Sequence, residues 1–179
     1  RKKYSEIAQK ECWRMADMIK NLQSFYKPSD GTFSEANMKL LLEEVLLFVE
    51  KTCLNKEIKI IRKYSNDKFL FEGIEDQIKQ VLLNVLQNAM DSISYDGKIT
   101  LNLAQTSKEI IIEIIDTGHG IDKEYQKFIF DPFYTTKGRK GTGLGLSVSY
   151  GIVKSHGGQI VFESDLNIGS TVTLVLPIS

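Results

Sequence analysis

Three polar side chains recur at helical spacing inside an otherwise apolar segment, namely Asn84, Asn88 and Asp91. Positions i, i+4 and i+7 lie on one face of a helix, so a helix here carries a polar stripe. The amide oxygen of asparagine is a neutral, hard ligand that suits Mg²⁺ bridging phosphate groups. A solvated helix face has the same pattern, so the stripe alone leaves a metal site and an ordinary surface both open.

A second candidate is an acid that ends an isoleucine-rich segment and precedes two glycines, Asp116 in the run Ile115–Ile121. A carboxylate fixed at the end of a strand can accept a hydrogen bond from an exocyclic amine such as the 6-amino group of adenine. The alternative is a tight turn in which the carboxylate bonds its own backbone.

The third candidate is a run of alternating glycines, Gly141, Gly143 and Gly145, that leads from a basic loop into an apolar helical pattern. Glycine lets the backbone approach an anion, and a helix start offers free N–H groups, so the combination favours phosphate. Leu144 stands where a Walker loop needs lysine, and the third glycine of a Rossmann fingerprint is missing. A simple flexible loop remains the alternative for the run taken alone.

An aromatic and basic segment precedes these glycines. Residues Phe130–Lys137 are rich in aromatic side chains, and Arg139 and Lys140 follow Lys137. A loop anchored by aromatic residues and tipped with cations can act as a lid over a polyphosphate.

The elements that must position these residues follow from hydrophobic periodicity. Helices and strands mix without strict βαβ alternation, which predicts an α+β fold. The sheet of this two-layer α/β sandwich would be mixed, mostly antiparallel and covered on one face by helices. In one helix, Leu41, Val45, Phe48 and Val49 are expected to share the buried face. The predicted helices are 4–26, 37–54, 75–94, 123–129 and 143–155, and the predicted strands are 58–61, 69–71, 98–104, 109–115, 159–164 and 171–176.

The first helix, 4–26, carries a coiled-coil-like apolar seam and needs a surface to cover it, which favours a partner helix or a second copy. Lys27–Gly31 contains a proline and predicts a linker. The chain begins without Met or a signal sequence, so we expect a fragment of a longer protein. Cys12 and Cys53 are too few for a disulfide framework or a zinc site. Both are expected to be buried in the fold, which fits a protein in a reducing compartment.

Composition excludes several classes of partner. The 23 basic and 23 acidic residues cancel, so no global field attracts nucleic acid or an anionic membrane. No apolar run approaches the roughly 18 residues that a membrane span needs. We therefore expect a cytoplasmic fragment that contacts neither nucleic acid nor a membrane, although its parent protein can be membrane-anchored.

The candidate segments, taken in order, resemble the four boxes of the catalytic, ATP-binding domain of bacterial sensor histidine kinases, within the Bergerat-fold (GHKL) superfamily. Asn84–Asn88 resembles the N box, Asp116–Gly120 the G1 box, Phe130–Phe133 the F box and Gly141–Gly145 the G2 box. The short lid is similar to that of the nitrogen-regulator and sporulation-kinase type.

The resemblance extends to the N-terminal helix, where Arg14–Pro28 is similar to the second helix of the dimerisation and phosphoacceptor hairpin. It implies two domains: 1–28 as part of that hairpin, truncated so that the helix with the acceptor histidine is absent, and 29–179 as the catalytic ATP-binding domain. Of the chain's own histidines, His156 has the surroundings of a helix C-terminus, which favours a structural role.

The resemblance also implies ATP and Mg²⁺ as cofactors and assigns roles to individual residues. Asp116 would bind adenine N6, Asn88 would ligate Mg²⁺, and Lys137 would neutralise phosphate charge. Many of these kinases carry lysine where this chain has Asp91, so the cationic role there passes to Lys137 or Arg139. The implied catalytic residues are Asn84, Asn88 and Lys137. The implied nucleotide-binding set is Asn84, Asn88, Asp91, Asp116, Gly118, Gly120, Ile121, Phe133, Thr136, Lys137, Arg139, Gly141, Thr142, Gly143, Leu144, Gly145, Leu146 and Thr171.

The implied activity is transfer of the ATP γ-phosphoryl group to a histidine on the missing helix, for relay to an aspartate of a response regulator receiver domain. The intact protein would be a homodimer joined through its N-terminal hairpin. Hydrolytic relatives carry a water-activating glutamate at position 84, whereas an asparagine amide cannot take up a proton. The alternatives are another GHKL protein, such as an anti-sigma-type serine kinase or an ATPase, and a degenerate ATP-binding scaffold.

Overall fold

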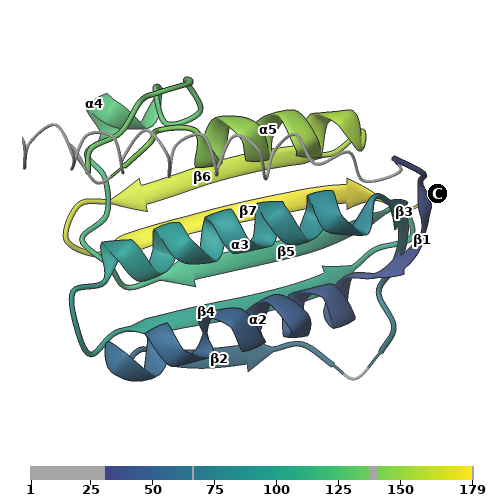
Figure 1. The fold of residues 1–179 in the computed structure, drawn as a ribbon, viewed down its shortest axis with the longest axis horizontal. Coiled ribbons are helices and arrows are strands. Elements are labelled where there is room, and N and C mark those ends of the chain that lie inside the picture. The colour runs from purple at the N-terminus through teal and green to yellow at the C-terminus, as the bar shows by residue number, and fades with distance from the viewer. Residues whose placement is uncertain (1–30, 66, 138–140, 179) are drawn as a thin grey trace, which may run out of the picture. The chain divides into compact units, whose positions relative to one another are not determined.

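The main sheet has five strands, and their order places β5 in its middle. The computed structural model describes residues 31–65, 67–137 and 141–178. The strand order is β2-β4-β5-β7-β6 (Figure 1). β2 pairs with β4 in parallel, and the other three pairings are antiparallel. The bounds are β2 Lys59–Lys63, β4 Lys98–Gln105, β5 Glu109–Asp116, β7 Gly169–Pro177 and β6 Gln159–Asp165.

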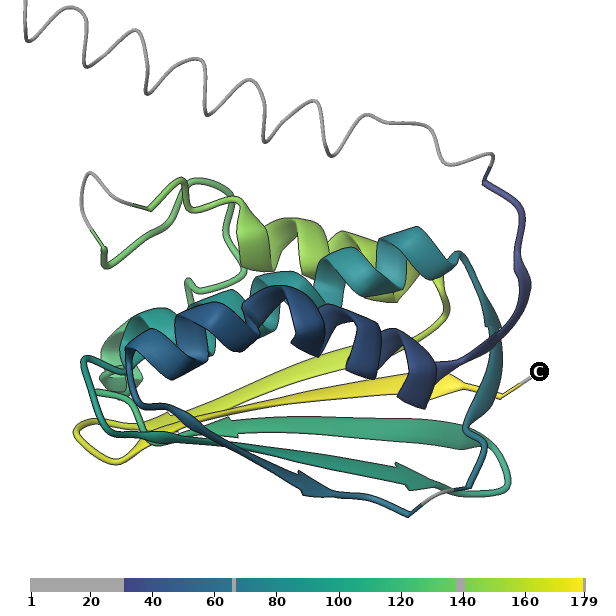
Figure 2. The ribbon, with the colours of Figure 1, turned by 60° about the horizontal axis from the view of Figure 1, so that its bottom comes forward.

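Three helices cover one face of this sheet: α2 (Met38–Asn55), α3 (Glu75–Ser92) and α5 (Gly145–Ser155) (Figure 2). α3 lies between α2 and α5 and packs against both (Figure 1). A one-turn helix, α4 (Lys123–Gln126), precedes the loop that leads to α5. The predicted α+β sandwich, with a mostly antiparallel sheet covered on one face, is therefore confirmed.

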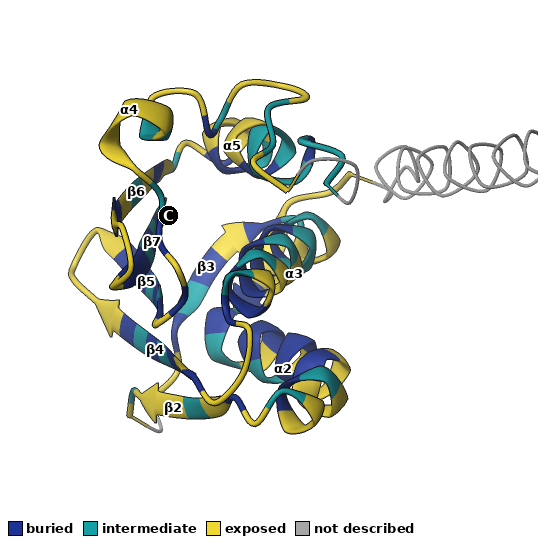
Figure 3. Ribbon diagram, turned by 90° about the vertical axis from the view of Figure 1, so that its left-hand side faces the viewer, coloured by how far each residue is buried: buried dark blue, intermediate teal, exposed yellow. Residues whose placement is uncertain are grey.

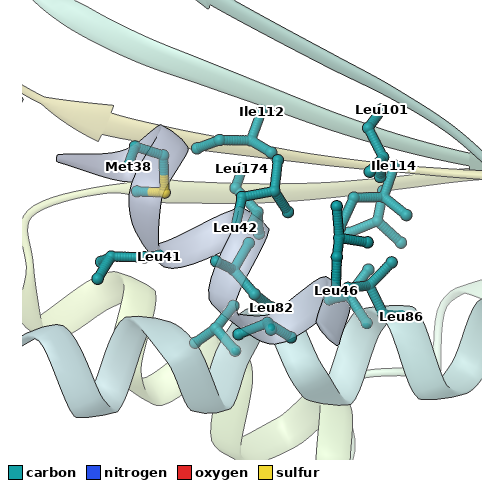
Figure 4. Packing of buried hydrophobic residues seen from close by; sticks show 14 of the residues in the cluster. Met38, Leu41, Leu42, Leu46, Leu82, Leu86, Leu101, Ile112, Ile114 and Leu174 are labelled. Carbon is teal, nitrogen blue, oxygen red and sulfur yellow. The ribbon is translucent and has the colours of Figure 1, made fainter. Parts of the chain in front are cut away.

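The core fills the space between the helices and the sheet, where the buried residues face one another (Figure 3). Fully burying one such aliphatic side chain stabilises the fold by about 1.5–3 kcal/mol. The layer is therefore rigid enough to hold the polar groups at its edge in fixed positions. Figure 4 shows part of this packing, which includes Met38, Leu42, Leu46, Leu82, Leu86, Leu101, Ile112, Ile114 and Leu174.

Side chains along β5 alternate between buried and half-buried, and this alternation determines which face of the sheet its last residue, Asp116, lies on. Ile110, Ile112 and Ile114 are buried, while the residues between them are half-buried. Side chains two residues apart share a face of a strand, so Asp116 continues the buried row toward the helix layer. It is indeed buried, at 7% exposure. β4 and β7 flank it, because Asp116 pairs with Ile99 on one side and Ser170 on the other.

Several boundaries differ from the predictions. α4 ends at Gln126 rather than 129, and α5 begins at Gly145 rather than 143. Phe48 is 80% exposed, so the prediction that it shares the buried face of α2 is wrong. Consecutive helical residues lie about 100° apart around the axis, which turns Phe48 away from the buried Val49. A short sheet of β1 (Ser34–Asn37) and β3 (Leu70–Gly73) adds a strand that periodicity did not predict.

The predicted N-terminal helix, its linker up to residue 30 and the loop residues 138–140 lie outside the described residues. The division into 1–28 and 29–179 stays a prediction.

Candidate functional site

The candidate site lies along one face of α3, where three separate segments of the chain contact successive turns of the helix. Asn84 contacts the start of α5, Asn88 contacts the loop before α5, and Ser92 contacts the end of β5. Each step of four residues advances about 6 Å along a helix, so the three contacts span about 12 Å. The predicted N, G1 and G2 boxes therefore converge on a single helix face.

The first contact surrounds Asp116. Its Oδ1 atom accepts a hydrogen bond from the Gly118 N–H at 2.8 Å and lies 2.8 Å from the Ser92 hydroxyl oxygen. Burial raises the pKa of the Asp116 carboxyl above its ordinary value of 3.8, and hydrogen bonds from Gly118, Ser92 and Ser170 partly oppose that rise. The site thus holds a buried carboxyl group with fixed orientation, and the adenine-binding role of Asp116 stays a prediction.

The turn after Asp116 is fixed against the β6–β7 hairpin. Gly120 has a φ of +64°, and a Cβ there would lie 2.1 Å from the Asp165 carbonyl oxygen. Two hydrogen bonds tie the same turn to that hairpin, from Ile121 N–H to the Ser164 hydroxyl and from Asn167 N–H to the His119 carbonyl. Glycine is required at position 120 by both conformation and space.

The second contact joins the predicted lid to the polar stripe of α3. The Lys137 ammonium donates to Asn88 Oδ1 at 2.9 Å and to Asp91 Oδ2 at 2.8 Å. Gln87 donates to the other Asp91 oxygen at 2.9 Å. Lys137 thus contacts the same Asn88 oxygen that was predicted to ligate a metal, and Asp91 supplies the carboxylate of this ion pair.

The third contact holds the start of α5. The Asn84 amide donates to the Gly145 carbonyl at 3.2 Å and to the Ser149 hydroxyl at 3.4 Å. The fully buried Ser149 donates to the same carbonyl at 2.9 Å. Among the described residues no side chain caps this helix start, whose N-cap residue is Leu144. Its first N–H groups are therefore oriented for an anion.

The loop before α5 closes on itself through backbone contacts. The Phe133 N–H donates to the Gly143 carbonyl at 2.9 Å. Gly143 has a φ of +68°, and a Cβ there would lie 2.3 Å from the Phe133 carbonyl carbon. Phe133 itself has a φ of +66° and is 72% exposed. Its ring therefore faces solvent, although its backbone braces the glycine run.

The remaining predicted residues lie around these contacts. A Cβ at Gly141 would lie 2.2 Å from the Thr135 hydroxyl oxygen, and Thr136 is exposed. Thr142 accepts from the Leu144 N–H at 3.4 Å. Leu146 is half-buried in the first turn of α5, and Thr171 pairs with Ile115 in the sheet. Arg139 lies outside the described residues.

Sequence reasoning missed Ser92 and Ser149. Ser92 follows Asn88 by four residues, so extending the polar stripe by one turn would have found it. Ser149 sits in an apolar helix and shows no pattern of its own. The structural role favoured for His156 agrees with its place at the C-cap of α5, where its ring accepts from the Ile74 N–H at 3.0 Å. Cys53 is free and buried.

The described residues were also compared with the features of a metal cluster and of a membrane span. They contain no group of three or more His, Cys, Asp or Glu side chains that could hold a metal ion. None of the helices they form is long and apolar enough to cross a membrane.

Comparison with known proteins identifies the family of the chain. Residues 73–179 match the family model described as histidine kinase-, DNA gyrase B-, and HSP90-like ATPase. The chain is 37% identical over 177 residues to the signal transduction histidine-protein kinase AtoS of Escherichia coli, covering 98% of this chain and 29% of AtoS. It is 32% identical over 179 residues to sporulation kinase C of Bacillus subtilis, covering 99% of this chain and 42% of that kinase. The chain therefore spans less than half the length of these curated relatives.

Solved structures of the histidine kinase ThkA are also similar. The nucleotide-free catalytic domain of ThkA is 33% identical with a TM-score of 0.75, covering 82% of this chain and 95% of that one. ThkA in complex with response regulator protein TrrA is 28% identical with a TM-score of 0.79, covering 99% of this chain and 51% of that one. The chain belongs to the histidine kinase-, DNA gyrase B-, and HSP90-like ATPase family, and its described domain is an ATP-binding catalytic domain of the sensor histidine kinase type.

Proposed function

We propose that this domain binds Mg-ATP along α3 and directs the γ-phosphoryl group to a histidine on the dimerisation hairpin of the intact protein. The observation that carries the proposal is the row of three contacts on α3, with a buried acid at one end and an uncapped helix start at the other. A span of about 12 Å suits an extended nucleotide that has its base at Asp116 and its phosphates near Gly145.

The residues present fit the cofactor. Asp116 offers a buried acceptor for the adenine amino group, with Gly118, Gly120, Ile121 and Thr171 shaping that end. The start of α5 and the two residues before it, together Gly143–Leu146, offer backbone N–H groups to phosphate oxygens. When bound, Mg-ATP supplies the phosphoryl group, whose transfer depends mainly on positioning and charge neutralisation by the protein.

The metal-binding role falls to Asn88. Mg²⁺ commonly takes one or two protein oxygens together with substrate phosphates, and Asn88 Oδ1 is such an oxygen. Lys137 donates to that same oxygen, so it would have to leave the oxygen for Asn88 to hold Mg²⁺. Lys137 and Arg139 would then neutralise phosphate charge, and Phe133, Thr136, Gly141 and Thr142 would belong to the lid that carries them.

Asn84 favours phosphotransfer to a residue over hydrolysis. Its amide nitrogen donates to the Gly145 carbonyl and the Ser149 hydroxyl, so the side chain is bound as a donor and has no group that can take a proton from water. This supports a kinase over the ATPase alternative. The similar kinase ThkA forms a complex with the response regulator protein TrrA, and we extend this to relay from the histidine of the present protein to a receiver-domain aspartate.

The test uses the intact protein with its complete dimerisation hairpin. With radiolabelled Mg-ATP, it should gain an acid-labile, base-stable phosphate on a histidine, and Asn88→Ala should abolish the labelling. A matched control, Ser155→Ala, changes an exposed helix end away from the site and should label normally. Acid-stable phosphoserine, or rapid phosphate release without histidine labelling, would contradict the proposal.

A further inference from the structure

Ser92, the last residue of α3, contacts both the end of β5 and the turn that follows it. Its carbonyl oxygen accepts from the His119 N–H at 3.1 Å. Its hydroxyl oxygen lies 2.8 Å from Asp116 Oδ1 and 2.7 Å from the Ala89 carbonyl oxygen. The last turn of α3 and the loop that carries the buried acid are therefore joined through this one serine.

The packing around the hydroxyl is close. A Cβ added at Gly118 would lie 1.9 Å from the Ser92 hydroxyl oxygen and 2.7 Å from Asp116 Oδ1. Gly118 donates to the same Oδ1 atom as Ser92 does. Two donors that converge on one oxygen fix the rotation of the carboxyl group, and this sets where the other oxygen points.

The hydroxyl has one proton and two acceptors in reach. An ionised carboxylate is the stronger acceptor, so the proton is donated to Asp116 rather than to Ala89. Ser155 offers a comparison, because its hydroxyl donates to the Ile152 carbonyl three residues back at 2.8 Å. Ser92 has the same local acceptor within reach at its own helix end, but its hydroxyl also reaches Asp116 Oδ1.

We propose that Ser92 is a positioning residue that orients the Asp116 carboxylate toward the 6-amino group of a bound purine, and so sets the preference of the site for 6-aminopurine nucleotides. This rests on the proposed binding of ATP. Burial raises the pKa of the Asp116 carboxyl, and the bonds from Gly118 and Ser92 oppose that rise, because they stabilise the ionised, hydrogen-bond-accepting form.

The experiment measures calorimetric affinity of the 179-residue chain for ATP and for purine riboside triphosphate, which lacks the 6-amino group, both with Mg²⁺. Ser92→Ala should weaken ATP binding about three- to tenfold and change the affinity for purine riboside triphosphate less than about twofold. Ser92→Thr keeps a hydroxyl and should restore most of the ATP affinity. Ser155→Ala, which removes the matched local bond, should leave both affinities unchanged.

The outcomes separate this inference from the function beneath it. Equal weakening of both nucleotides by Ser92→Ala would show a purely structural role and overturn the inference, as would unchanged ATP affinity. If the unaltered chain discriminates between the two nucleotides and Asp116→Asn removes that discrimination, the proposed ATP site stands whatever Ser92 does. Absence of ATP binding by the unaltered chain would overturn both.

Discussion

Replacing Asn84 by aspartate tests the donor role of this side chain, because it changes one NH₂ group to an oxygen. In the native structure the amide nitrogen lies 3.2 Å from the Gly145 carbonyl oxygen and 3.4 Å from the Ser149 hydroxyl oxygen. Ser149 already gives its proton to Gly145. A carboxylate at position 84 is acceptor-only, so it cannot donate to the Gly145 carbonyl, and any proton that it takes from the Ser149 hydroxyl is lost to that carbonyl.

The magnitude follows from a comparison with alanine. Asn84→Ala removes two long hydrogen bonds and leaves the Gly145 carbonyl bonded to Ser149, which should cost about 0.5–1.5 kcal/mol of unfolding free energy. Asn84→Asp loses the same bonds and leaves a half-buried carboxylate facing acceptors, so about 2–4 kcal/mol is expected. The two variants should therefore differ clearly, although aspartate is nearer to asparagine in size and shape.

Urea unfolding followed by circular dichroism measures both costs. The penalty of Asn84→Asp should shrink below about pH 4, because the protonated carboxyl regains a donor for Gly145. Equal costs for alanine and aspartate at pH 7, or a penalty for aspartate that does not fall with acid, would refute the donor role assigned to Asn84.

Three further predictions concern the glycine turn, the lid contact and the buried acid. Gly120→Ala should destabilise the fold by more than about 1 kcal/mol, since its Cβ would lie 2.1 Å from the Asp165 carbonyl oxygen, whereas Gly151→Ala in α5, with nothing within 4 Å, should raise the melting temperature. Equal melting temperatures for these two variants would contradict the strain argument. Asp91→Asn removes the carboxylate that holds the lid lysine, and should tighten Mg-ATP binding up to about fivefold by calorimetry; weaker binding would mean that this acid contacts the nucleotide complex itself. Because the pKa of Asp116 is raised in the folded chain, the fold holds its proton more tightly and loses stability as pH rises above 3.8. The unfolding free energy of Asp116→Asn, relative to the unaltered chain, should therefore increase with pH from about 4 in urea titrations, and a constant difference would contradict this.

Much of the fold could be predicted from the sequence, because buried apolar residues recur at the period of the helix or strand that carries them. The isoleucine-rich run of β5 predicted the strand, whereas the buried face on which Asp116 lies follows from the alternating burial that the structure shows. The apolar residues of α3 recur at helical spacing and form its buried side, which includes Ile78, Val81 and Leu86. β1 could not be read in this way, because Ser34–Asn37 has neither alternation nor β-branched residues, and it is a strand only because it pairs with β3.

The site could be predicted only in part, because the hydrogen bonds that build it join residues that are distant in the chain. The Asn84–Gly145 bond spans 61 positions and the Ser92–Asp116 contact spans 24. Motif spacing indicated that Asn84 belongs to the candidate site, but it did not indicate that the Asn84 amide donates to the start of α5. In the same way, the pairing of Lys137 with Asn88 and Asp91 depends on how the loop folds over α3, which no local pattern encodes.

Calorimetric titration of the chain with Mg-ATP, beside the Asp116→Asn variant, tests the central claim most directly. The claim is that Asp116, buried at the end of the central strand and held by Ser92 and Gly118, recognises the adenine of a bound ATP. We predict binding by the unaltered chain and at least about tenfold weaker binding by the variant. Unchanged affinity in a variant that remains folded by circular dichroism would contradict the claim.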